Sequence, residues 1–282
     1  MSIRTAAYYL FISITVSVFY QCKTTKTTME TASSHISVKD FEVDEIGNIY
    51  TVSKDNQITK YDITNNRNYH YDNYSSGELA ALDVTNPHKI MLFYKDFQQI
   101  IILDNTLSVI SEIQLSPQWL ITAAGYANDG NIWLFDSSTI RFLKINNKGE
   151  IVNESFIAKE IANDTISNSK IYDRDNYMYV ILGNRKLALY DNQTYFIRTL
   201  NLESVAKPSI INNIIYYFSP QRNSIMAFNL KYNEINVIYD FTKNAIKATM
   251  AILNTDKIYF YTQQKISGYP QIGQIYIINI KK

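Results

Sequence analysis

The sequence predicts an all-β fold built from six repeats, and three observations predict it. Aromatic residues are abundant, with 23 Tyr and 13 Phe in 282 residues, and such side chains suit the half-buried surface of a pleated sheet. Short apolar stretches alternate with turns rich in Asp, Asn and Gly, and no stretch shows a helical period. The same pattern returns about every 42 residues along the chain.

Each repeat contains a short apolar strand, a polar turn, a second strand that opens on an apolar residue, and two further strands. The matched apolar residue recurs at intervals of 41, 42, 46, 37 and 43 residues, at Ile49, Ile90, Ile132, Met178, Ile215 and Ile258. The third strands end on Asp or Asn at similar intervals, at Asp62, Asp104, Asn146, Asp191, Asn229 and Asn279. A period of about 40 to 45 residues with four short strands is typical of one blade of a β-propeller. The sequence therefore predicts a six-bladed β-propeller.

The fourth strand of each blade is expected to lie on the outside of the ring. Five such strands can be read from the sequence, at 69–74, 109–115, 151–157, 195–202 and 235–241. The sixth repeat ends after its third strand, at 274–280. Because an open ring would leave an unpaired sheet edge, we expect Ser34–Val38 to add the fourth strand to the last blade, in a 3+1 arrangement. The propeller is thus predicted to span residues 34–282.

The first residues are expected to be a signal peptide, residues 1–21. Arg4 precedes an apolar stretch at 6–19, which is shorter than the roughly 20 residues that span a bilayer. The only cysteine, Cys22, follows. This arrangement resembles a bacterial lipoprotein signal, in which the cysteine becomes the lipidated N-terminus, although the small residue usual before that cysteine is missing. An ordinary signal or an uncleaved anchor stays open, and 22–33 is expected to be a flexible tether.

The repeats over 34–282 resemble the six-bladed TolB-like and NHL-like propellers. The blade motif is generic, so this resemblance implies a fold and no particular activity; the class includes envelope scaffolds, sugar-acting enzymes and lactonases with a central metal. Together with Cys22, the resemblance implies a lipid-anchored protein of the bacterial cell envelope. Lys23 rather than Asp follows the cysteine, so we expect the outer membrane, facing the periplasm.

Several kinds of chemistry are disfavoured by the sequence. The 27 Lys and Arg nearly balance the 26 Asp and Glu, whereas a nucleic-acid-binding protein usually carries a basic excess. His35, His70 and His88 all fall outside the predicted inner strands, so no metal site is expected. There is no Gly-x-Ser-x-Gly motif or glycine-rich phosphate loop. We therefore expect no catalytic residues and no cofactor.

Five residues are candidates for binding a partner. Phe97, Trp119, Arg185, Arg222 and Tyr269 lie in loops that join successive blades, or the second and third strands of one blade. Aromatic residues and Arg dominate binding hot spots because they combine a large contact area with a polar group. For each of them, ordinary packing between blades is the competing interpretation.

Two functions follow from these observations. The leading hypothesis is a monomeric, noncatalytic binding or scaffold lipoprotein that holds another envelope protein on one face of the propeller. The alternative is a propeller that binds a small ligand or glycan, or an enzyme, with its site in the central channel. That site would need charged side chains at the starts of the inner strands, such as Asp40, Glu78, Lys170 or Lys247.

Overall fold

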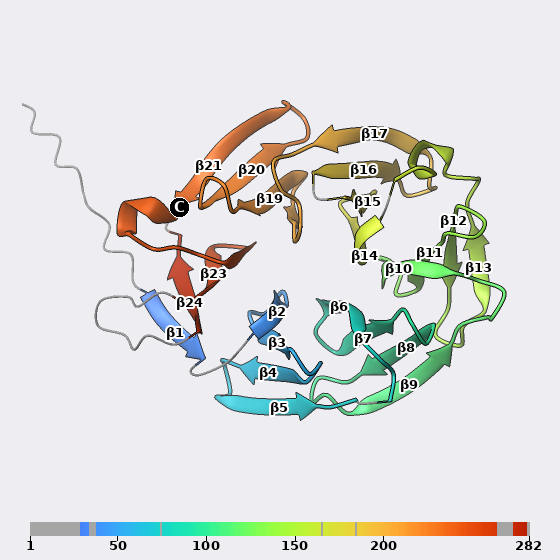
Figure 1. Ribbon diagram of the computed structural model, residues 1–282, viewed down its shortest axis with the longest axis horizontal. Helices are drawn as coiled ribbons and strands as arrows, with labels where there is room; N and C mark the ends of the chain where they lie inside the picture. The colour runs from blue at the N-terminus through green and yellow to red at the C-terminus, as the bar shows by residue number, and fades with distance from the viewer. Residues whose placement is uncertain are drawn as a thin grey trace, which may run out of the picture.

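The computed structural model describes residues 29–33, 38–73, 75–164, 166–183, 185–263 and 273–280. Within these ranges the regular structure consists of 24 strands and two short 3₁₀-helices, η1 (Lys159–Ile161) and η2 (Phe241–Asn244). The prediction of an all-β fold is confirmed. The sheets stand side by side around a centre, as in a β-propeller (Figure 1).

The first two sheets follow the chain outward from the centre in four antiparallel strands each. One sheet contains β2 (Val38–Val43), β3 (Ile49–Ser53), β4 (Ile58–Asp62) and β5 (Arg67–Tyr71). The next contains β6 (Leu79–Asn86), β7 (Lys89–Tyr94), β8 (Gln99–Leu103) and β9 (Val109–Gln114).

An eight-stranded sheet comes next and consists of two antiparallel sets of four. The first set is β10 (Ile121–Tyr126), β11 (Ile132–Asp136), β12 (Arg141–Ile145) and β13 (Ile151–Glu154). The second is β14 (Ile166–Arg174), β15 (Tyr177–Leu182), β16 (Lys186–Asp191) and β17 (Phe196–Asn201). The inner strands β10 and β14 join the two sets through a parallel pairing at Ala124 and Lys170.

Two more sheets complete the arrangement. One contains β18 (Ser209–Ile211), β19 (Ile214–Ser219), β20 (Ser224–Asn229) and β21 (Glu234–Asp240). The other contains β22 (Met250–Asn254), β23 (Lys257–Thr262) and β24 (Gln274–Asn279), and β1 (Met29–Ser33) is its outermost strand. β1 pairs antiparallel with β24, from Met29 opposite Ile278 to Ser33 opposite Ile275.

The strand that pairs with β24 differs from the predicted one. It is Met29–Ser33, within the segment assigned to the tether, whereas the prediction placed it at Ser34–Val38. Val38 instead begins β2, with its side chain in the core. A closing strand that ended at Val38 would leave no residues for the chain to pass from the outer edge of one sheet to the inner strand of the next, a distance of about three strand spacings of roughly 4.8 Å.

The repeated Asp or Asn at the end of the third strand has a local structural role. Its side chain accepts hydrogen bonds from backbone N–H groups of the turn that follows, as Asp104 does from Thr106 and Ser108, and Asp191 from Gln193 and Tyr195. These are Asx turns, which reverse the chain tightly and favour Asp and Asn. The regular spacing in the sequence therefore marks the turns that lead into the outer strands.

The hydrophobic core consists of clusters that lie between neighbouring sheets. Six such clusters follow one another around the centre. One of them joins the two ends of the chain: Phe41 of β2 and Ile49 of β3 share a cluster with Tyr259 of β23 and Ile277 of β24. Because every sheet buries both of its faces, the strands are largely apolar on both sides.

We predict that Gly125→Ala destabilises the fold, because a Cβ atom there would lie 1.9 Å from the carbonyl oxygen of Ile171. This contact is with backbone, where β10 and β14 meet, so no side-chain movement relieves it. The expected loss is about 3 kcal/mol of unfolding free energy, measured by urea denaturation. The control is Gly183→Ala, where a Cβ meets nothing within 4 Å and only the positive φ costs about 1 kcal/mol. Equal losses in the two variants would contradict the prediction.

Candidate functional site

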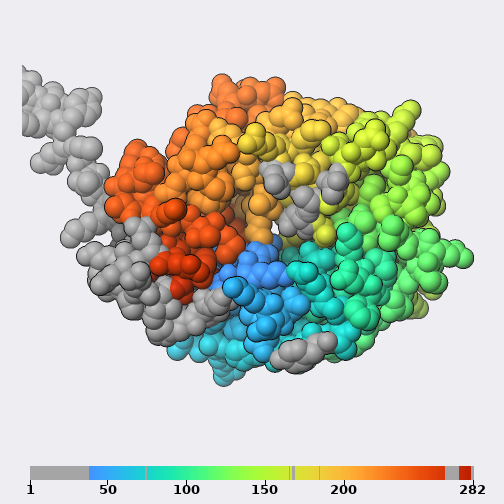
Figure 2. Space-filling model, in the orientation of Figure 1, coloured from blue at the N-terminus to red at the C-terminus, as the bar shows by residue number. Residues whose placement is uncertain are grey.

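The centre of the ring contains a cavity of about 640 Å³, hereafter the central cavity; Figure 2 shows a small opening at this point in the molecule. Its walls are the ends of the inner strands and the turns that follow them. They comprise residues 42–45, 84–88, 126–128, 207–211 and 252–255, with Lys170, Tyr172 and Arg174. The sequence interpretation had placed the ligand-facing surface among the loops at the other end of the inner strands. The central cavity therefore lies mainly at the opposite end of the inner strands from those loops.

Lys207 reaches across the channel to the inner strand β2. It lies two residues before β18, and its ammonium forms ion pairs with Asp40 and Glu42. The same Nζ donates a hydrogen bond to the carbonyl oxygen of Phe41 at 2.8 Å. Burial alone would lower the pKa of Lys207, but the two carboxylates outweigh it and raise the pKa above its ordinary value. The ammonium is thus held in its charged form.

Lys170 links three of the inner strands. From β14 its Nζ lies 3.4 Å from Glu42 Oε1 on β2 and 3.8 Å from Asp83 Oδ1 on β6. Asp83 also accepts hydrogen bonds from the backbone N–H groups of Thr85 and Tyr126. Burial would raise the pKa of Asp83, but the Lys170 charge and these hydrogen bonds prevail, so the pKa lies below its ordinary value.

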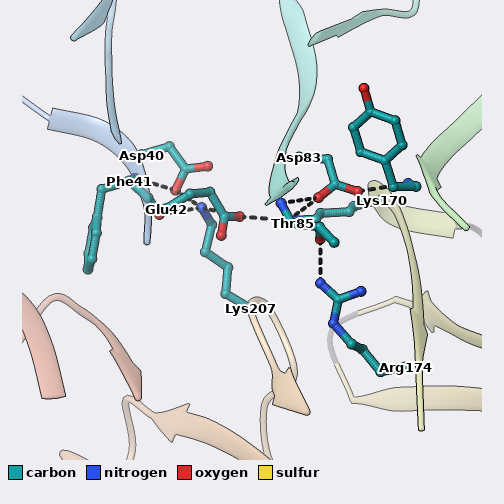
Figure 3. A network of polar contacts seen from close by, with 9 residues as sticks. Asp40, Phe41, Glu42, Asp83, Thr85, Lys170, Arg174 and Lys207 are labelled. Carbon is teal, nitrogen blue, oxygen red and sulfur yellow. Dashed lines mark hydrogen bonds and ion pairs between the residues drawn. The ribbon is translucent and has the colours of Figure 1, made fainter. Parts of the chain in front are cut away.

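These five residues form one cross-channel network, which we define as Asp40, Glu42, Asp83, Lys170 and Lys207 (Figure 3). Glu42 is its central member because it contacts both lysines. Glu42 and Lys170 line the central cavity and also a small cavity of about 40 Å³. The network therefore separates two hollows along the channel, and in it three carboxylates surround two ammonium groups.

Two further carboxylates near the cavity are used within the fold. Asp44 accepts hydrogen bonds from the backbone and side chain of Asn48 and from the Tyr50 hydroxyl, which fixes the turn between β2 and β3. Asp173 Oδ2 accepts from Trp133 Nε1 at 3.0 Å and from the backbone N–H of Asn128. Burial raises the pKa of Asp173, and the hydrogen bonds offset this only in part.

Arg174 enters the cavity from the end of β14. Its guanidinium donates to Thr85 Oγ1 at 2.6 Å and to the carbonyl oxygen of Asp173 at 2.8 Å. Both acceptors are uncharged, and in the described part of the chain no carboxylate forms an ion pair with Arg174. The guanidinium is therefore the one cationic group of the cavity wall whose charge has no direct partner among the described residues.

The described residues contain neither a cluster that could hold a metal ion nor a helix that could span a membrane. No three His, Cys, Asp or Glu side chains there lie close enough together to hold a metal ion. His88 lines the central cavity from the turn after β6, and His70 lies on the outer strand β5, bonded to Thr59. None of the described helices is long and apolar enough to cross a bilayer.

The candidate binding residues from the sequence do not form one described cluster. Phe97 is 54% exposed on its turn, whereas Trp119 is partly buried against the core. Arg185 is exposed, and Arg222 forms an ion pair with Glu203, with its Nε at 2.8 Å from the carboxylate. Tyr269, Cys22 and residues 264–272 lie outside the described residues. The role of the five candidate residues in binding a partner therefore stays a prediction.

The channel residues were anticipated only in part. Asp40 and Lys170 were named as charged side chains at the inner strands, and both belong to the network. Glu78 instead pairs with Lys39 near the surface, and Lys247 does not line the central cavity. Glu42, Asp83, Arg174 and Lys207 were missed. The available signal was a charged residue within the inner strands β2, β6 and β14 or shortly before β18.

Comparison with known proteins shows the fold. No family model matches the sequence, and no curated protein matches it. Among solved structures, the WD40 domain of Neurospora crassa Pan2 has a TM-score of 0.56 at 10% identity, over 90% of this chain and 96% of that one. A luciferin-regenerating enzyme has a TM-score of 0.55 at 12% identity, over 90% and 95% of the two chains.

A third similar structure is an inactive virginiamycin B lyase from Staphylococcus aureus with quinupristin. Its TM-score is 0.53 at 12% identity, over 89% of this chain and 83% of that one. The chain is therefore similar to β-propellers over most of its length. At such low identity the likeness shows the fold alone.

We predict that Lys207→Met destabilises the protein by about 2 kcal/mol at pH 7, because it leaves the partly buried Asp40 without its cation and the buried Glu42 with Lys170 alone. The raised pKa of Lys207 sets the pH dependence. Its stabilisation is complete below the ordinary value of 10.5 and is lost as the pH rises through the folded-state pKa. The difference between wild type and variant should therefore be constant near neutrality and shrink at strongly alkaline pH, as measured by urea denaturation.

The control for this prediction is Lys39→Met, which removes the more exposed ion pair with Glu78. Surface pairs of this kind contribute less than about 1 kcal/mol. A loss for Lys39→Met as large as that for Lys207→Met would show that the cross-channel network has no special role in stability.

Proposed function

We propose that the protein is a noncatalytic binding protein that holds a protein partner against the outside of its propeller. One observation carries this proposal. The outer strands β9, β13, β17 and β21 expose large aliphatic and aromatic side chains, which we call the outer band: Val109, Ile110, Ile151, Val152, Phe196, Ile197, Ile235, Val237 and Ile238. Large apolar side chains exposed to solvent often mark an interaction site where they adjoin one another.

Two exposed aromatic rings meet between the outer strands β13 and β17. Phe156, just after β13, is 74% exposed, and Tyr195, just before β17, is 53% exposed. Their ring centroids are 6.0 Å apart, so they present one aromatic surface. Phe196 is anchored beneath by an edge contact with the buried Tyr190, at 5.5 Å between centroids. Such rigid, exposed aromatic residues are suited to act as hot spots for a partner.

The outer band does not extend to every sheet. The outer strand β5 has the sequence Arg-Asn-Tyr-His-Tyr and contains no aliphatic residue. Natural proteins usually protect an unpaired outer strand with polar or charged residues, and β5 follows this rule. The four strands of the outer band depart from it. Of these, β13 and β17 belong to neighbouring sets of strands, whereas β9 and β21 lie on opposite sides of the centre (Figure 1), so the partner is proposed to contact β13 and β17.

The proposed function goes together with a proposed blade number and a proposed cellular location. We infer a six-bladed ring in which the eight-stranded sheet is two blades joined at β10 and β14 and in which β1 closes the last blade. The pairing of β1 with β24 and the cluster shared by Phe41 and Tyr259 support it. From the sequence we further propose a monomer with a cleaved signal, lipidated at Cys22 and anchored in the outer membrane facing the periplasm. The partner would then be another envelope protein.

The cross-channel network bears on the enzymatic alternative. Each of its acidic and basic groups is engaged in an ion pair that connects inner strands or the loop before β18, whereas a general acid or base must be free to reach a substrate. This supports a noncatalytic role for the centre of the channel.

We predict that the partner is recovered in stoichiometric amount when tagged wild-type protein is isolated from its own membranes in mild detergent and analysed by quantitative mass spectrometry. The double variant Phe156→Ser, Tyr195→Ser should lose it, because it removes the exposed aromatic pair between β13 and β17. The matched control is Phe97→Ser, an exposed ring on the loop face. Wild type that is isolated alone, or a partner lost only in the control, would overturn the proposed site.

Lipidation has its own test. We predict that cells fed an alkyne-bearing palmitate label the wild-type protein and that Cys22→Ser abolishes the label, because the chain has no other cysteine. The modified N-terminal peptide should be found by mass spectrometry. An unlabelled wild type that is fully released from membranes by salt would contradict the anchor.

A further inference from the structure

Arg174 is placed to receive a ligand in the central cavity. A guanidinium has five N–H donors in a planar fork, and Arg174 uses two of them, on Thr85 and on the carbonyl of Asp173. These two bonds fix the group between β14 and the turn after β6. Its remaining donors have no acceptor among the described residues, although the residue is only partly exposed.

The other cations of the cavity wall already have carboxylate partners. Lys170 and Lys207 are paired within the cross-channel network, and Glu42 is shared between them. Asp44 accepts its hydrogen bonds inside its own turn, and Glu45 lies exposed at the edge of the cavity wall. Arg174 acts on the carboxylate of Asp173 through longer-range electrostatics, but among the described residues no carboxylate forms an ion pair with it.

The rest of the wall is divided into two kinds of surface. Asn86 and Asn128 contribute amide groups on the side of β6 and β10. On the side of β18 and β22 the wall contains the apolar Ile210, Ile252 and Leu253, next to the polar Ser209, Asn254 and Thr255. A volume of about 640 Å³ lies in the usual range of small-molecule sites, which are mostly apolar with a few well-placed polar groups.

We propose that the central cavity binds a small organic anion, whose carboxylate or phosphate group pairs with Arg174 and whose apolar body packs against Ile210, Ile252 and Leu253. A guanidinium fork matches the two oxygens of such a group and forms strong, charge-assisted hydrogen bonds with it. Thr85 is the positioning residue, because its hydroxyl accepts one N–H and so turns the other donors toward the ligand. This site is independent of the outer band.

The test is calorimetric titration of the full-length protein with three probes: 4-phenylbutyrate, phenyl phosphate and the neutral 4-phenylbutanamide. We expect saturable binding of at least one anion and weaker binding of the amide; the better anion tells a carboxylate ligand from a phosphate ester. Arg174→Gln should weaken anion binding about tenfold or more. Arg174→Lys, which keeps the charge but not the fork, should restore part of the affinity. The matched control, Arg67→Gln at an exposed position on the outer strand β5, should bind as wild type.

Folding is followed by circular dichroism and thermal melting. If Arg174→Gln does not fold, Arg174→Lys and Thr85→Val decide the question, since both keep a cation in the cavity and both should bind the anion several-fold more weakly than wild type. The proposal is overturned if neither anion binds, if the amide binds equally well, or if the folded Arg174 variants retain full affinity.

Discussion

Opposite charges have to meet at the centre of this protein, and that requirement governs how its inner strands are arranged. Sheets that pack radially bring their inner strands together on one axis. Here β2, β6 and β14 carry Glu42, Asp83 and Lys170 at that axis, and Lys207 arrives from a loop. Any one of these charges would be costly to bury alone, so each depends on a partner from another sheet. The network thus connects segments that are distant in sequence, in a ring whose sheets otherwise meet mainly through apolar side chains.

Polar and apolar side chains are distributed unusually between the centre of the ring and its outer strands. Charged groups lie buried at the axis, while aliphatic and aromatic side chains are exposed on the outer strands. Burying those outer side chains is favourable in proportion to the apolar area that leaves water, which is the reason for proposing a protein partner there. For the polar channel we propose a small charged ligand instead.

The features that could be predicted from the sequence are those set by local interactions. The repeat of about 42 residues was visible because the turn after the third strand uses an Asx side chain, such as Asp104 or Asp191, at a fixed place. Contacts between segments that are distant in sequence produce no comparable pattern. Asp40 and Lys207 are 167 positions apart, and nothing local indicates that they meet. The position of β1 was missed for a similar reason, since Met29–Ser33 is a polar segment whose strand structure depends on its pairing with β24.

The joint between β10 and β14 makes the ring uneven in stiffness. Elsewhere neighbouring sheets touch through side chains, which can slide past one another, but at Ala124 and Lys170 they are joined backbone to backbone. Local opening of the ring should therefore start away from this joint, in the sheets on the opposite side. Arg174 lies four residues beyond it on β14. We therefore expect the guanidinium to stand on the part of the channel wall that moves least. A donor held there loses little conformational entropy when a ligand binds.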